Sequence, residues 1–165
     1  MPYETTYPNS VVTVDLIGEE RQTYLQTLVD TYNELNGKGY PIPLAYLREG
    51  VDGGEPYVEL EHMEGGASIG DLMAEGKLEL EKARGIYAGI CDARKRIREK
   101  EGITIYNNHR YNTMYNMETG RACICDLTQC SRLPNFAKVR KYTAEHLEKM
   151  RIKNEELMAQ EEGGA

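Results

Sequence analysis

The chain has 165 residues, of which 40% are hydrophobic and 28% charged, a composition that predicts one folded domain with its own core. Its net charge of −7 argues against nucleic acid or an anionic membrane as the main partner, because both need a basic surface. The first residues, MPYETTYPNS, lack the basic and apolar regions of a secretory signal, and no stretch is long and apolar enough to cross a bilayer. We therefore expect a cytoplasmic protein.

The first half of the chain predicts a strand, a helix and two more strands. Residues 11–17, VVTVDLI, are rich in β-branched side chains and predict a strand. Apolar residues recur at helical spacing through residues 19–36, and the glycines of NGKG end this helix. Two further strands are expected within residues 42–50 and 56–63, joined by a turn at VDGGE.

A glycine break and a short helix follow, and residues 78–100 carry the clearest helical pattern in the chain. Ser68 stands where its side chain would cap the short helix. Apolar side chains recur every three or four residues from Leu80 to Ile97, and Gly102 ends the pattern. We expect this longer helix to be the buried axis of the second half of the domain.

The next stretch, GITIYNNHRYNTMYNMETGRACICDL, predicts a hairpin with polar residues on both arms. Its turn is expected at residues 117–120, and its second strand at residues 122–125. Asn112 on one arm and Asp126 after the other offer an amide oxygen and a carboxylate, which are ligands that Mg²⁺ accepts. The alternative is structural, with Asp126 ending a strand and Asn112 capping a turn.

The four cysteines predict reduced structural thiols. They stand at Cys91, Cys123, Cys125 and Cys130. Their spacing contains neither a C-x-x-C pair nor matched histidines, which disfavours a zinc site. Cys123 and Cys125 are two residues apart on a predicted strand, so their side chains share a face.

A long charged helix is expected over residues 136–160, before a flexible tail at residues 161–165. Its apolar residues follow roughly heptad spacing, and its basic start and acidic end both oppose the helix dipole. Packing against an acidic surface, self-association through this helix or a protein partner would each explain the pattern. A solvated helix docked by its apolar stripe would explain it as well.

Taken in order, these elements and motifs resemble the protein kinase-like fold. The stretch VELEHMEGGASIGDLM resembles the kinase strand, hinge and short helix, and the helix at residues 78–100 stands where the next kinase helix lies. The resemblance puts Leu60 at the gatekeeper position, and Glu61 and Met63 at the hinge, where backbone groups would meet an adenine. It implies a reduced front lobe over residues 11–62 within a single domain.

The resemblance also implies a reduced back lobe over residues 63–135 that contains the catalytic and metal-binding loops. Asp126 and Leu127 stand where kinases carry Asp-Phe-Gly, and Asn112 stands where they carry a metal-binding asparagine. This placement implies ATP and Mg²⁺ as cofactors, with Asn112 and Asp126 holding the metal.

The departures from the kinase pattern are serious. Asn107 stands at the position of the catalytic base, and an amide cannot accept a proton as a carboxylate does. His109 is the nearby side chain that would have to serve instead. The glycine-rich phosphate loop and the strand lysine have no counterpart, and Asp15 near the lysine position would repel phosphate.

Short kinase-like proteins of this plan exist among bacterial effectors and phage proteins, and this chain resembles them with further catalytic loss. We predict an α+β, minimal kinase-like domain that works as a binding or regulatory module for a protein partner, with weak or no phosphotransfer. An effector of this kind would act in a host cytosol. Two alternatives stay open: a divergent active Mg-ATP-dependent kinase that uses Asp126 and Asn112 for metal, and an unrelated α+β adaptor.

Overall fold

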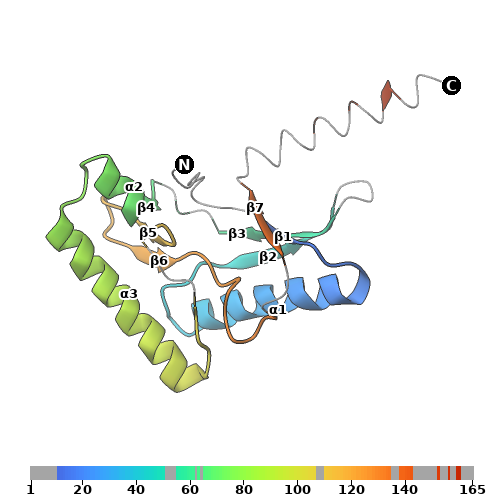
Figure 1. Cartoon of the computed structure of the whole chain (residues 1–165), viewed down its shortest axis with the longest axis horizontal. Helices are drawn as coiled ribbons and strands as arrows, with labels where there is room; N and C mark the ends of the chain where they lie inside the picture. Colours follow the sequence, from blue (N-terminus) through green and yellow to red (C-terminus); the bar gives the residue numbers. More distant parts are fainter. Residues whose placement is uncertain are drawn as a thin grey trace.

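The computed structural model describes residues 11–50, 55–61, 63, 65–106, 110–134 and 138–142, together with residues 152, 156, 159 and 160. Within them, two small antiparallel sheets and three helices form an α+β fold (Figure 1), which confirms the α+β part of the predicted fold class. The helices are α1 (Gly18–Gly37), α2 (Ile69–Ala74) and α3 (Leu80–Glu101).

The larger sheet has four strands in the order β2-β3-β1-β7. These strands are β1 (Val11–Val14), β2 (Ala45–Arg48), β3 (Tyr57–Leu60) and β7 (Val139–Tyr142). All three pairings are antiparallel, and all four residues of β1 are buried between its two neighbours and the helix below. The β-branched run at the start of the chain therefore forms a central strand.

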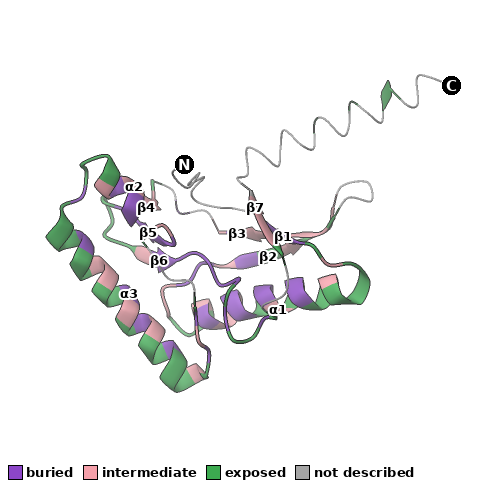
Figure 2. Ribbon diagram, in the orientation of Figure 1, coloured by how far each residue is buried: buried purple, intermediate pink, exposed green. Residues whose placement is uncertain are grey.

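Helix α1 packs along the larger sheet and contributes six of the twenty buried residues of the main core. Its buried side chains lie on the face turned toward the sheet (Figure 2), as the helical spacing predicted. They are Tyr24, Leu25, Leu28, Val29, Tyr32 and Leu35, with Thr31 beside them. Burying each large apolar side chain contributes about 1.5–3 kcal/mol, so this face anchors the sheet.

Helix α3 lies on the outside of the molecule, and the prediction of a buried axis is wrong. Its described bounds differ by one or two residues from the expected ones, and Gly102 ends it with φ at 69°. Only Ala83, Ile90, Ala93 and Ile97 are buried on it, whereas Leu80 is 53% exposed. Helix α3 therefore buries one narrow stripe and exposes most of the remainder.

The smaller sheet has three strands in the order β4-β5-β6. They are β4 (Ala67–Ser68), β5 (Thr113–Tyr115) and β6 (Ala122–Ile124). The short helix α2 follows β4, and the Ser68 hydroxyl accepts a hydrogen bond from the backbone N–H of Asp71 at 3.0 Å. The predicted cap is therefore confirmed.

Strand β7 corrects the predicted helix at residues 136–160. Residues 139–142 form a strand that pairs with β1 along its whole length, from Val14 opposite Val139 to Val11 opposite Tyr142. Without this pairing the edge of β1 would leave its backbone groups open, so the tertiary contact overrides the local helix preference. Ile152, Glu156, Ala159 and Gln160 are helical, and the tail at residues 161–165 lies outside the described residues.

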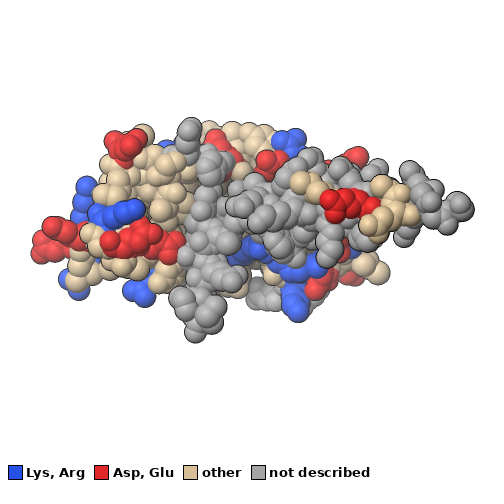
Figure 3. Space-filling view, turned by 90° about the horizontal axis from the view of Figure 1, so that it is seen from above, with Lys and Arg blue, Asp and Glu red and all other residues tan. Residues whose placement is uncertain are grey.

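The described surface carries both signs of charge. On the face seen in Figure 3, acidic and basic side chains lie interspersed. Among the helices that the structure describes, none combines the length and the apolar character that a bilayer crossing requires.

Candidate functional site

The β5–β6 hairpin brings the two predicted metal ligands to neighbouring positions. Met114 lies opposite Cys123 in the ladder, and the Cys125 N–H donates to the Asn112 carbonyl at 2.9 Å. Asn112 therefore lies across from the residue that precedes Asp126. Both side chains are buried, with 3% of Asn112 and 5% of Asp126 exposed.

The predicted turn of this hairpin is confirmed. The Asn116 side-chain oxygen accepts hydrogen bonds from the N–H groups of Glu118 and Thr119 at 2.9 and 3.1 Å. Gly120 takes a positive φ of 74°, which favours glycine. This Asx-type turn fixes the register of both arms, so it fixes the position of Asn112 relative to Cys125.

The segment proposed as a hinge lies against the hairpin. Leu60 ends β3 as a buried core residue, and β4 pairs with β5 so that Ala67 lies opposite Tyr115. Met63 packs into a buried cluster with hairpin side chains. The Glu61 carboxylate accepts from Arg121 at 3.3 Å, which ties the same segment to the far arm.

The two residues of the predicted base region, Asn107 and His109, lie outside the described residues. Among the predicted site residues that the structure describes, Met63 packs on the hairpin and Asn112 is hydrogen-bonded to the residue before Asp126, whereas Leu60 belongs to the main core.

Asp126 is held by two partners, one on each carboxylate oxygen. Its Oδ1 accepts from the Thr128 N–H at 2.8 Å and from the Thr128 hydroxyl. Its Oδ2 forms an ion pair with the Lys141 ammonium, whose side chain is 28% exposed. A buried carboxylate needs such partners, because an unpaired charge at this depth would cost several kcal/mol.

Sequence reasoning missed Lys141, because it assigned residues 138–142 to a helix. The signal available was alternation in KVRKY, where Arg140 and Lys141 point to opposite faces of a strand. Arg140 pairs with Asp15 at 3.0 Å and with Glu55 at 2.8 Å, while Lys141 reaches Asp126. Asp15, the acid that was expected to repel phosphate, is thus paired with Arg140 of β7.

Two tyrosines of α1 hold the chain on either side of Asp126. The Tyr32 hydroxyl donates to the Cys125 carbonyl at 2.6 Å and accepts from the Leu127 N–H at 3.1 Å. Tyr24 donates to the Thr128 carbonyl at 3.3 Å. Burial, and next the negative charge of Asp126, hold the pKa of both phenols well above the usual tyrosine range.

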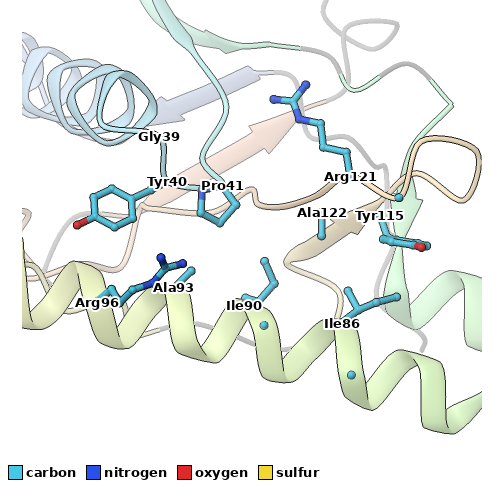
Figure 4. A pocket seen from close by; sticks show the side chains of 13 residues that line it. Gly39, Tyr40, Pro41, Ile86, Ile90, Ala93, Arg96, Tyr115, Arg121 and Ala122 are labelled. Carbon is cyan, nitrogen blue, oxygen red and sulfur yellow. The ribbon is translucent and has the colours of Figure 1, made fainter.

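The two grooves that the structure describes lie away from Asn112 and Asp126. One, of about 510 Å³, runs between α3 and the segment 39–41 (Figure 4), where Ile86, Ile90 and Arg96 of the helix face Tyr40, Ala122 and Tyr115. A second, of about 410 Å³, lies beside the start of α1. Neither of these two grooves is lined by Asn112 or Asp126.

The donor set fits Mg²⁺ poorly in this arrangement. Mg²⁺ takes near-octahedral oxygen ligands and prefers carboxylates that can turn toward it. Asp126 is the carboxylate that was predicted to bind the metal, and its two oxygens already bind Thr128 and Lys141. Over the described part of the chain, no group of three or more His, Cys, Asp or Glu side chains is placed to hold a metal ion.

Comparison with protein-family models and with curated proteins gives no match for this chain.

Proposed function

We propose that this chain is a degenerate kinase-like protein that acts as a binding or regulatory module, with weak or no phosphoryl transfer. The observation that carries the proposal is the state of Asp126, a buried carboxylate whose oxygens are engaged by Lys141 and Thr128. A metal ion at this position would have to displace the Lys141 ammonium before it reached the carboxylate.

Two neighbour relations support the kinase-like part of the proposal. The resemblance expects Asn112 and Asp126 to be neighbours, and the hydrogen bond from the Cys125 N–H to the Asn112 carbonyl supports this expectation at the level of the backbone. It also requires the hairpin to lie beside the hinge segment, which the pairing of β4 with β5 provides.

The loss of catalysis rests on the position of Asn107. Phosphoryl transfer to a hydroxyl needs a group that orients the hydroxyl and accepts its proton, and an amide accepts no proton at neutral pH. No step of the reaction is assigned to other side chains of this hairpin. The protein would then act through its surface on a protein partner.

One observation favours the active-kinase alternative. The sequence offers no lysine in the expected strand, yet the structure holds the Lys141 ammonium against Asp126. A cation next to the proposed metal ligand is what a phosphate-bearing ligand would need. In that alternative Lys141 would release Asp126 and bind phosphate when Mg-ATP enters.

Two measurements on the full-length protein separate these functions. We expect ATP with Mg²⁺ to raise the melting temperature of the wild type only slightly, and we expect no incorporation of radiolabelled phosphate. Saturation at about 100 times Kd would stabilise the fold by about 2.7 kcal/mol, so tight binding is readily seen. Asp126→Ala is the matched variant for the labelling.

Robust labelling by the wild type that disappears in Asp126→Ala would replace this proposal with the active-kinase alternative. Strong stabilisation by ATP without metal would contradict both kinase-like functions, because both assign the nucleotide to a metal-dependent site.

A further inference from the structure

One face of the β5–β6 hairpin carries three sulfur-containing side chains in succession. Met114 and Cys123 are directly paired, and Cys125 follows Cys123 by two residues, so all three point to the same face. Met63, from the segment after β3, packs against them and completes a buried cluster. Between 0% and 9% of each of the four residues is exposed.

The two thiols are in contact but not bonded to each other. The sulfur atoms of Cys123 and Cys125 lie 3.4 Å apart, which is van der Waals contact rather than the roughly 2.05 Å of a disulfide. Both are free cysteines. Two thiolates at this separation would repel one another strongly unless a cation joined them.

The donors of the cluster select a particular class of metal. The described side chains of this buried cluster are two thiols and two thioethers. Thioethers are poor ligands for hard or borderline ions, and a structural Zn²⁺ site needs four thiolate, imidazole or carboxylate ligands. Mixed thiolate and thioether donors instead suit Cu(I), which accepts low coordination numbers and an apolar environment.

We propose that Met63, Met114, Cys123 and Cys125 form a Cu(I)-binding site on the inner face of the β5–β6 hairpin. The cysteines are the primary ligands and the methionines complete the shell. This site adjoins the pair formed by Asn112 and Asp126, since Cys125 is hydrogen-bonded to Asn112 and precedes Asp126, but it does not depend on a kinase-like function.

The fold holds Met63 over the hairpin. A Cβ atom added at Gly66 would lie 2.7 Å from the Met63 sulfur and 3.1 Å from its carbonyl oxygen, so the glycine leaves the space that the thioether fills. The Gly66 N–H also donates to that carbonyl at 3.0 Å. The position of Met63 is therefore set by the backbone of the segment that carries it.

Binding is a proton-for-metal exchange. Each thiol releases its proton to solvent as its sulfur bonds to Cu(I), and no electron is transferred because copper stays monovalent. Metal binding by thiols therefore releases protons to the solvent, as it does at other thiolate sites.

The test presents Cu(I) as its coloured bicinchoninate complex to the reduced, full-length protein without oxygen. We expect the protein to withdraw one equivalent of copper, with loss of the complex colour and gain of a sulfur-to-copper band in the ultraviolet. Cys123→Ser and Cys125→Ser should each abolish stoichiometric uptake. Cys91→Ser is the matched control, because this partly exposed thiol of α3 lies outside the cluster.

A further variant keeps the test decisive if the cysteine variants fail to fold. Met63→Leu preserves volume and apolar character, so it should retain the fold while removing one ligand. Since even the loss of a group behind a metal ligand costs roughly 10–100-fold in affinity, this variant should weaken Cu(I) by about tenfold or more.

Three results would overturn the site. They are failure of the wild type to withdraw copper, unchanged affinity in folded Met63→Leu, and loss of uptake in Cys91→Ser. Any of them would leave the four sulfurs as core packing.

Discussion

At the scale of single residues, the contact between Asp126 and Lys141 decides how the hairpin is interpreted. Asp126 stands two residues after the end of β6, close to where both the metal and the structural interpretations expected it. The two interpretations differ in what binds the Asp126 carboxylate. In this structure it is the Lys141 ammonium of β7. A charge pair at this depth holds two distant segments together more than it adds net stability.

Lys141→Met should destabilise the fold, because it leaves the Asp126 carboxylate buried without its cation. Breaking a buried pair costs about 3–5 kcal/mol, and the partial exposure of Lys141 reduces the expected loss to about 1–3 kcal/mol. Urea unfolding measures it, with exposed Lys138→Met as the control. The double variant with Asp126→Asn should recover part of the loss. A single variant as stable as the wild type would show that the pair is absent in solution.

The buried tyrosines predict a loss of stability in alkali. Their pKa is higher in the folded than in the unfolded protein, so their contribution is complete below the ordinary tyrosine pKa near 10 and falls as pH rises toward the folded value. Tyr32→Phe should therefore flatten the decline of melting temperature above about pH 10. The same variant should cost about 1–2 kcal/mol at pH 7, because it loses the hydrogen bonds to Cys125 and Leu127.

Tyr106→Phe is the matched control for this measurement, since that side chain is 58% exposed. Parallel pH profiles for the wild type and Tyr32→Phe would contradict the assignment of the alkaline loss to Tyr32.

At the scale of the elements, local patterns predicted most of the fold. Helix α1 and the strands β1, β2 and β3 form where the sequence patterns predicted a helix and three strands, because helical spacing and β-branched runs are visible in the sequence itself. The Ser68 cap and the turn after Asn116 depend on side-chain chemistry that the sequence displays directly.

The errors share a physical origin in long-range packing. Residues 139–142 have a mixed local preference, and only the open edge of β1, more than a hundred residues earlier, makes them a strand. The partners of Asp126 were missed for the same reason, since Lys141 reaches it only through that pairing. The exposure of α3 depends on which elements pack against it, which periodicity does not report.

Helix α3 offers a test of where glycine is required. At Gly85 and Gly89 an added Cβ would meet nothing within 4 Å, so alanine fits there without strain. Since glycine inside a helix costs about 0.8–1.0 kcal/mol relative to alanine, Gly85→Ala/Gly89→Ala should raise the free energy of unfolding by about 1–2 kcal/mol. Chemical denaturation measures the gain.

Gly70→Ala is the contrasting variant, because its Cβ would lie 2.5 Å from the ring of Tyr111. It should destabilise the protein while the α3 variants stabilise it. If the double variant proved less stable than the wild type, the α3 glycines would be needed for a packing contact that the described residues do not show.

At the scale of the whole molecule, β7 is the last described strand, and it pairs with β1, the first. It covers the edge of β1, and through Lys141 it also reaches the smaller sheet's hairpin at Asp126. This late strand therefore adds a link between the two sheets to the core that they share with α1, and we expect the fold to depend on it. A partner that binds the segment after β7 would pull directly on this link.

Two truncations separate the role of β7 from that of the segment that follows it. A chain ending after Pro134 loses β7, exposes the edge of Val11–Val14 and leaves Asp126 without its cation, so we expect aggregation or loss of cooperative unfolding. A chain ending after Tyr142 keeps the strand and should unfold cooperatively. If the segment beyond residue 142 is the partner-binding surface, pull-down with this longer truncation should lose the partners that the full chain retains. Retention of every partner would instead move the binding surface onto the described fold, and a stable, cooperative Pro134 truncation would contradict the closing role of β7.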